Sequence, residues 1–192
     1  SSGYISRRLI KGLENLKINY DYTVRNAKNN IVQMLYGNDG FDASKLEHQS
    51  LKLIEYSNIQ MGDYFKFPEN IDWGVLLSKR AANKVKKNKN LKQLLDREFD
   101  DLMNMRHILR YDIYTNLDII DSVSVMVPVN IFRLINTAIK KFKSGKVSDI
   151  SPEYIIESLD KLQQNISKYF KTENNLQLIN ILLRSLLSTK QV

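Results

Sequence analysis

The 192-residue sequence contains no cysteine, only two histidines and only three prolines. Without cysteine the chain forms neither disulfides nor thiolate metal sites, which suits a reducing compartment. His48 and His107 lie far apart in the sequence, and no recognisable spacing supplies the further ligands that zinc needs. We therefore expect no metal site and no cofactor in this chain.

Long apolar runs are also missing from the sequence. No run of about eighteen or more apolar residues occurs, and the N-terminus lacks the basic, apolar and small-residue order of a secretory signal. We expect a soluble protein without a membrane partner. With 43% hydrophobic and 26% charged residues, the composition is typical of one globular domain, with or without an appended element.

Recognisable catalytic motifs are equally absent. The sequence has no G-x-S-x-G, no phosphate-binding loop and no dinucleotide fingerprint. The acidic run Asp96, Glu98, Asp100 and Asp101 has the composition of a two-metal carboxylate site. On a helix, however, Asp101 points away from the face that Asp96 and Asp100 share, so a solvated helix face is favoured.

Two further polar features have an ordinary interpretation. The segment GNDGFD at 37–42 is rich in oxygen ligands but lacks the spacing and the distal glutamate of a calcium loop, which favours a turn. His48 and His107 have no neighbouring nucleophile pattern and are expected to be surface or core polar residues. The sequence therefore shows no recognisable catalytic site.

Helical periodicity dominates what is present. Apolar residues recur every three or four positions, as in Leu91, Leu95, Leu102, Met105 and Leu109. Helices are predicted over about 3–16, 42–54, 89–111, 128–142, 152–169 and 172–186. Their start signals are Asp42 as a cap, Pro128 in a first turn, the triplet Ser151-Pro152-Glu153, and Thr172 as a cap.

The β content is expected to be small. Residues 18–26 and 30–37 are rich in β-branched and aromatic residues and predict a β-hairpin, and 116–130 should hold a short extended piece. Residues 56–75 mix aromatic residues with glycine and proline, which indicates an irregular connection. The expected fold class is mainly α with a small β-hairpin (α+β), a multi-helix module.

The charge is strongly basic, with a net charge of +8 and an isoelectric point of about 9.5. A basic protein favours contact with a polyanion such as nucleic acid. The run KRAANKVKKNKN at 79–90 holds six basic residues and no acid. It is interpreted either as a phosphate-contacting stripe or, as we favour, as a solvated mobile loop, because its asparagine and lysine content lacks the interleaving of arginines with aromatic residues that is typical of a specific reader.

Six short motifs are distributed over the chain: GYISRRLIKGLENL, YDYTVRN, QMLYGNDG, EHQS, PVNIFRLINTA and LLRSLLSTKQV. They resemble, in that order, the patterns G-Y-I-Q-R-R-L-x-K-A-L-E-D, Y-D-G-T-V-R-N, Q-F-L-Y-G-E-D-G, E-K-Q-S, L-P-V-N-x-R-R-L-I-Q-N-A and L-L-R-S-R-L-A-T-R-R-V of the largest subunit of eukaryote-type RNA polymerase II. They bracket the chain, whereas residues 52–125 resemble the family only weakly. Departures at Tyr22, Asn38 and His48, where the family has glycine, glutamate and lysine, indicate a divergent homologue, from a large DNA virus or an AT-rich protist.

The resemblance implies that residues 1–17 are the tail of the bridge helix and residues 18–192 the foot domain, a peripheral, non-catalytic structural and interaction module. The family's metal-binding loop N-A-D-F-D-G-D is absent from this chain, so catalysis, magnesium and zinc are expected elsewhere in the subunit. The implied DNA-binding residues are Tyr4, Arg7, Arg8 and Lys11, which would face template DNA.

The implied partners are the other polymerase subunits, template DNA in the assembled enzyme, and transcription or capping factors. The implied location is the nucleus for a cellular protein, or a cytoplasmic replication site or virion for a viral one. Two alternatives stay open. A stand-alone basic helical nucleic-acid-binding domain explains the charge, and a small hydrolase has only the acidic run in its favour.

Overall fold

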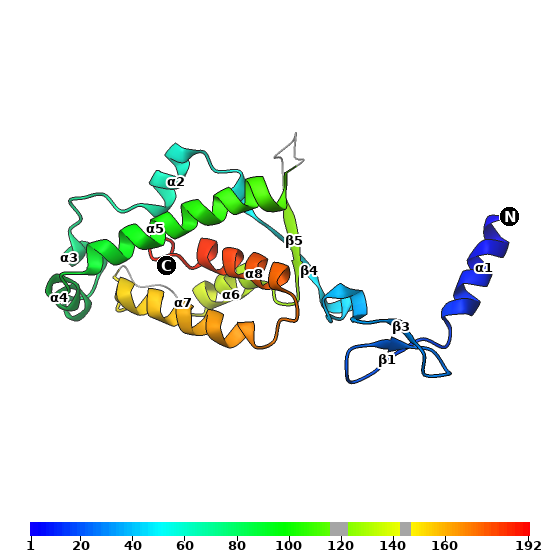
Figure 1. Cartoon of the computed structure of the whole chain (residues 1–192). Helices are drawn as coiled ribbons and strands as arrows, with labels where there is room; N and C mark the ends of the chain where they lie inside the picture. Colours follow the sequence, from blue (N-terminus) through cyan, green and yellow to red (C-terminus); the bar gives the residue numbers. More distant parts are fainter. Residues whose placement is uncertain (116–122, 143–146) are drawn as a thin grey trace.

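The computed structural model describes residues 1–115, 123–142 and 147–192 (Figure 1). The helices are α1 (Ser2–Leu13), α2 (Asn58–Phe65), α3 (Trp73–Leu76), α4 (Lys79–Lys87), α5 (Leu91–Ile108), α6 (Ile131–Phe142), α7 (Pro152–Ser167) and α8 (Glu173–Leu186). The strands are β1 (Lys17–Ile18), β2 (Val24–Arg25), β3 (Ile31–Gln33), β4 (Glu47–Ser50) and β5 (Ser124–Val127). The mainly α fold with small antiparallel sheets confirms the predicted class.

A helical body built from α2 to α8 holds the main core. The long helix α5 runs along α7 and α8, and α6 contacts α8, with the β4–β5 ribbon closing one side (Figure 1). The core residues come from all these elements: Leu51, Leu53, Ile54, Met61, Phe65, Leu102, Leu109, Val123, Val125, Val127, Ile131, Ile179, Ile181, Leu182 and Leu183. Each fully buried leucine, such as Leu102, contributes about 2 kcal/mol of hydrophobic stabilisation.

The N-terminal elements lie apart from this body. Helix α1 and the three-stranded sheet β1–β2–β3 extend away from the helices in Figure 1. The predicted hairpin is confirmed as the antiparallel pair β2–β3, and a tight turn divides its first half into two strands, β1 and β2. Tyr22 lies in this turn with φ of 67°, the left-handed region that favours glycine. The glycine in the family pattern at this position therefore has a backbone reason.

The loop at 37–42 is a turn, as predicted. Gly37 and Gly40 have φ of 61° and 77°, and the carboxylates of Asp39 and Asp42 accept backbone hydrogen bonds. Asp39 accepts a hydrogen bond from the amide of Phe41 at 2.9 Å, and Asp42 accepts one from the amide of Ser44 at 3.0 Å. Both are local turn contacts that fix the chain direction.

The prediction of one continuous helix over 42–54 is wrong. Asp42 does cap a helix, but this helix is a single 3-10 turn, Ala43–Lys45, and only Lys52–Ile54 at the end of the range form a second 3-10 turn. Residues Glu47–Ser50 then form β4, which pairs with β5 in the register Glu47–Val127 to Ser50–Ser124. Val125 and Val127 are buried on that ribbon, so a strand distant in sequence overrides the local helical pattern.

Two segments predicted to lack regular structure are helical. The connection at 56–75 contains α2, which begins with a capping box in which Ser57 and Gln60 bond each other's backbone amide, and the short α3, capped by Asp72. The basic run predicted as a mobile loop forms α4 instead, because Ala81, Ala82 and Val85 supply a buried face.

The C-terminal helices follow the prediction with one shift. Helix α6 begins at Ile131 rather than near Pro128, because the Asn130 side chain accepts the amide of Arg133 at 2.9 Å and so caps the helix there. Helices α7 and α8 begin after Ser151 and Thr172 as predicted, with Pro152 in the first turn of α7. The predicted extended piece is confirmed as β5, and residues 116–122 of that prediction lie outside the described residues.

Candidate nucleic-acid interface

Helix α1 carries the four predicted DNA-binding residues. At the helical repeat, Tyr4, Arg7, Arg8 and Lys11 lie on one face, and all four are exposed, with Tyr4 at 70%. Within the described residues none of the four side chains forms a hydrogen bond or ion pair. The structure thus brings the predicted group together on one cationic helix face.

The opposite face of α1 is apolar. Ile5, Leu9 and Leu13 form the predicted stripe and are 57%, 62% and 59% exposed, so nothing in the described chain covers them. All twelve residues of α1 are exposed. An isolated helix of this length is marginal in water, and the described part of the chain adds little packing to stabilise α1.

A second cationic face lies on α4. Its exposed residues are Lys79, Arg80, Asn83, Lys84, Lys86 and Lys87, and the helix contains no acid. This face lies opposite the buried Ala81 and Val85, which orients the cations toward solvent. The density of charge suits a polyanion, although the helix offers no aromatic residue for stacking on a base.

The acidic run on α5 is partly misassigned by the sequence prediction. Asp96 and Asp100 are exposed as predicted, but Glu98 is buried, 7% exposed. Its carboxylate accepts hydrogen bonds from the Thr189 amide, at 3.1 Å, and from the Thr189 hydroxyl. Burial raises the pKa of Glu98, and the Thr189 hydrogen bonds oppose that rise.

A missed periodicity explains the burial of Glu98. Leu91, Leu95, Glu98, Leu102 and Met105 follow one another at steps of four, three, four and three, so Glu98 occupies a core position of the helix. Among the described residues no group of three or more histidine, cysteine or acidic side chains is placed to hold a metal ion.

The histidines match their predicted role. His48 is an exposed residue on β4 whose Nδ1 lies 3.4 Å from the Ser124 hydroxyl, and His107 packs against Tyr111 on α5 with ring centroids 4.5 Å apart. Among the described residues neither histidine has an acidic hydrogen-bond partner of the kind that orients a catalytic base.

The motifs of the first fifty residues meet a motif from much later in the chain. From EHQS, Glu47 accepts two hydrogen bonds from Arg133, and the buried Gln49 donates to the carbonyl of Val129 at 2.6 Å and accepts the amide of Ile131 at 2.9 Å. All three partners belong to PVNIFRLINTA. The motifs are therefore structural contacts that hold the start of α6 against β4.

The C-terminal motif is anchored in the same way. Arg184 binds Asp160 and Gln163 of α7, and Thr189 binds Glu98 of α5. Lys190 donates to the carbonyls of Asp63 and Lys66 at the end of α2, at 2.5 and 2.6 Å. The motif LLRSLLSTKQV thus connects three helices of the body.

Two arginines that the sequence analysis did not identify, Arg106 at the end of α5 and Arg110 in the turn after it, contact the segment before α2. Arg106 donates to the carbonyl of Tyr56 at 2.7 Å, and Arg110 donates to the carbonyls of Ile54 and Tyr56 at 2.6 to 3.0 Å. Backbone carbonyls leave no signal in the sequence, so these partners could not be inferred.

No helix in the described ranges has the length and apolarity required to cross a membrane.

Comparisons with known proteins agree with this distribution of motifs. The family model of RNA polymerase Rpb1, domain 6, matches residues 41–192. Over its whole length the chain is 30% identical to two proteins of Trypanosoma brucei brucei, DNA-directed RNA polymerase II subunits RPB1-A and RPB1-B, in alignments of 220 residues. The chain spans 12% of the length of each of these relatives.

Proposed function

Since the chain belongs to the Rpb1 family of RNA polymerase subunits, we propose that it is a non-catalytic structural and interaction module of a DNA-directed RNA polymerase. The observation that carries this proposal is the use of the matching motifs. The side chains of these motifs form hydrogen bonds within the fold, as expected of a structural module. They include Glu47, Gln49, Arg133 and Thr189. Nucleotidyl transfer belongs to other parts of the enzyme.

The proposal divides the chain into residues 1–17, a bridge-helix tail, and residues 18–192, a foot domain. In the assembled polymerase the cationic face of α1 lies toward template DNA, with Arg7, Arg8 and Lys11 neutralising phosphates and Tyr4 packing on a base or sugar. The apolar face of α1 packs on neighbouring polymerase segments. The exposure of that face in the free chain supports this part of the proposal.

The partners that follow are the other polymerase subunits, with transcription or capping factors on the outer surface of the helical body. The location that follows is the nucleus in a cell, or a cytoplasmic replication site or virion for a viral enzyme. The match over the whole chain favours this assignment over the stand-alone nucleic-acid-binding domain, since a binding domain does not require motifs distributed from one end to the other.

The test asks whether the acidic run on α5 contributes to catalytic activity. We expect the isolated chain to show no nucleotidyl transfer, nuclease or ATPase activity with magnesium. In a reconstituted polymerase, Asp100→Ala combined with Asp101→Ala should leave primer extension essentially unchanged. The Asp100 side chain is exposed, and within the described ranges neither residue belongs to a cluster that could hold a metal ion. Magnesium-dependent turnover by the isolated chain that this double substitution abolishes would overturn the proposal.

A further inference from the structure

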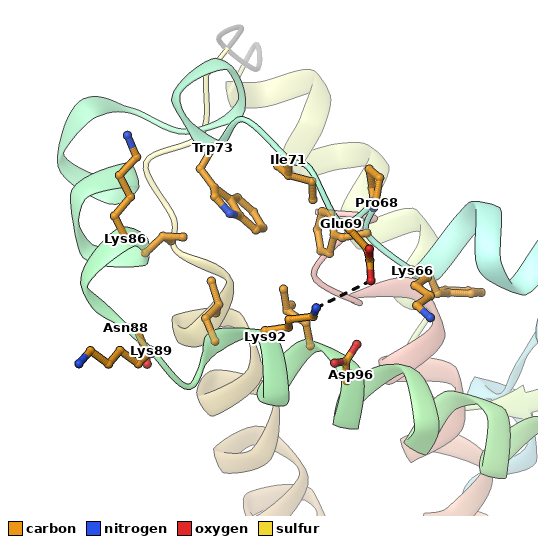
Figure 2. A pocket seen from close by; sticks show the side chains of 15 residues that line it. Lys66, Pro68, Glu69, Ile71, Trp73, Lys86, Asn88, Lys89, Lys92 and Asp96 are labelled. Carbon is orange, nitrogen blue, oxygen red and sulfur yellow. Dashed lines mark ion pairs between the residues drawn. The ribbon is translucent and has the colours of Figure 1, made fainter.

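A groove of about 460 Å³ lies between the segment joining α2 to α3 and the facing parts of α4 and α5 (Figure 2). Its lining includes the rings of Phe67 and Trp73, whose centroids are 5.3 Å apart, together with Ile71 and Leu95. Trp73 and Leu95 also pack against a small second core, made of Leu77, Ala81, Ala82, Val85 and Leu91. The groove therefore has an apolar floor held by its own cluster of buried side chains.

Lysines outnumber acids around this groove. The charged lining residues are Lys66, Lys86, Lys89, Lys92, Glu69 and Asp96. Lys92 and Glu69 approach each other at 3.8 Å, but their side chains are 76% and 87% exposed, so this pair is weak and easily exchanged for another partner (Figure 2). Lys86 and Lys89 form no ion pair within the described chain, which leaves their charge available.

We propose that this groove binds an acidic peptide segment carrying one or two large apolar side chains. The apolar side chains bury against Trp73, Ile71 and Leu95, and the carboxylates approach the lysines at the rim. This division of labour, an apolar anchor for affinity and complementary charge for orientation and rate of association, is common in peptide recognition. The inference rests on the proposed interaction role and names a partner chemistry for it.

The lining favours a peptide over a nucleic acid. Single-stranded nucleic acid requires open aromatic faces on which bases stack. Here Phe67 and Trp73 are tilted against each other at 56° and are both partly buried, so they do not form a series of parallel, fully exposed faces for successive bases. The rim also lacks arginine, the residue best suited to bidentate phosphate binding.

The groove contains a built-in reporter, because Trp73 is the single tryptophan of the chain. The experiment displays a library of random short peptides, selects it against the 192-residue chain, and titrates the enriched peptides while following tryptophan fluorescence. We expect enrichment of peptides rich in aspartate and glutamate that also contain leucine or phenylalanine, and a saturable change in Trp73 emission. Selection of peptides without acidic residues would overturn the proposal.

Charge reversal at the rim supplies the decisive variants. Lys86→Glu combined with Lys89→Glu should weaken peptide binding about tenfold or more at low salt, with the circular dichroism spectrum unchanged. The matched control, Lys28→Glu with Lys45→Glu, makes the same change in net charge at exposed sites outside the groove and should leave affinity within about twofold. If both double variants lost peptide affinity equally, the effect would come from the overall net charge, and the proposal would be overturned.

Two further arms complete the test. Ile71→Asp places a carboxylate in the apolar floor without altering the second core, and it should abolish binding of the selected peptides. A single-stranded oligonucleotide should leave Trp73 emission unchanged. If the oligonucleotide instead changed that emission in a manner dependent on Lys86 and Lys89 while acidic peptides did not bind, the groove would be a nucleic-acid site. All arms use the free chain, so their failure is distinct from a failure of the primer-extension test.

Discussion

Glu47 accepts hydrogen bonds from both terminal nitrogens of Arg133, at 2.7 and 2.8 Å, although the two residues are 86 positions apart. Asn130 donates to the same carboxylate at 3.1 Å. This cluster fixes the first turn of α6 to β4, beside the buried contacts of Gln49. The arrangement explains why short motifs far apart in the sequence occur together, since each supplies one half of the same contact.

We predict a favourable coupling between Glu47 and Arg133 that depends on pH. Hydrogen bonds from Arg133, and then from Asn130, hold the pKa of Glu47 below its usual value of 4.5. A carboxylate with a lowered folded-state pKa stabilises the fold above 4.5, and this contribution is lost as the pH falls through the lowered pKa. Urea unfolding of Glu47→Gln, Arg133→Met and the double variant should show coupling at pH 7 that disappears in acid.

The outcome that contradicts this prediction is a coupling of equal size at both pH values, since only the ionised carboxylate accepts both guanidinium bonds. Because both side chains are partly exposed, with 64% of Arg133 and 38% of Glu47 accessible, we expect the effect to be modest and reduced by salt. The control pair is Asp21→Asn with Arg25→Met. The native Asp21 and Arg25 side chains form an ion pair in the region of the N-terminal sheet, away from the helical body.

For the buried Glu98 we predict a loss of stability of about 2 kcal/mol on substitution by alanine, which leaves the Thr189 amide and hydroxyl without their acceptor. The measurement is urea unfolding at pH 7. Asp100→Ala, on the exposed side of the same helix, is the control and should change stability by less than about 0.5 kcal/mol. A loss no larger than that of the control would show that the Glu98–Thr189 contact does not hold the C-terminal segment.

Glu98→Gln separates charge from hydrogen bonding. Burial raises the pKa of Glu98 in the folded state, so the native protein binds this proton more tightly than the unfolded chain does. Its contribution to stability is therefore full below the usual 4.5 and is lost as the pH rises through the raised pKa. The stability of Glu98→Gln relative to the original chain should accordingly increase from pH 4.5 upward. A flat difference over that range would contradict the raised pKa.

Sequence reasoning succeeded where one chain segment decides the outcome. Helices α5, α7 and α8 follow their apolar periodicity, and the cap at Ser151 with Pro152 marks the start of α7. The four residues predicted for DNA contact share a face of α1 because helical geometry alone determines it. Periodicity, however, cannot report whether another element covers a face, so the exposure of Ile5 and Leu9 required the structure.

The predictions from the sequence are wrong where contacts with a segment distant in sequence determine the secondary structure or the burial. Glu47–Ser50 is a strand because it pairs with β5, whose partner residues lie 74 or more positions away in the sequence, a contact that no local pattern contains. Residues 79–87 form a helix because Ala81 and Val85 find an apolar neighbour in Leu91, although the lysines suggested a solvated loop. Glu98 was assigned to the surface for its charge, whereas its spacing within the leucine stripe placed it in the core.

Hydrogen exchange should divide the chain unevenly. We predict slow amide exchange in α5 and α8, which supply fully buried residues such as Leu102 and Ile181, within a unit that folds independently over about residues 20–188. Residues 1–12 should exchange quickly in the isolated chain, because no residue of α1 is buried. Mass spectrometry of peptic fragments measures this, and a protected α1 in the free chain would contradict the uncovered helix described here.

The final prediction contrasts the assembled enzyme with the free chain. In a reconstituted polymerase, Arg8→Ala and Lys11→Ala should slow elongation or weaken the grip on the template, because each removes a cation from the face proposed to lie along DNA. In the isolated chain the same changes should matter little, since a few exposed cations give only weak affinity that falls steeply with salt.

Tyr4→Ala distinguishes stacking from charge at this face. It should slow the assembled polymerase as the charge changes do, while leaving the salt dependence of DNA binding by the free chain unaltered, because it removes no charge. Lys28→Ala, an exposed cation in the turn between β2 and β3, is the control and should leave elongation unchanged. Strong, sequence-selective binding by the free chain that requires Arg8 and Lys11 would contradict the polymerase assignment of α1, since affinity that survives without the rest of the enzyme is the property of a self-sufficient binding domain.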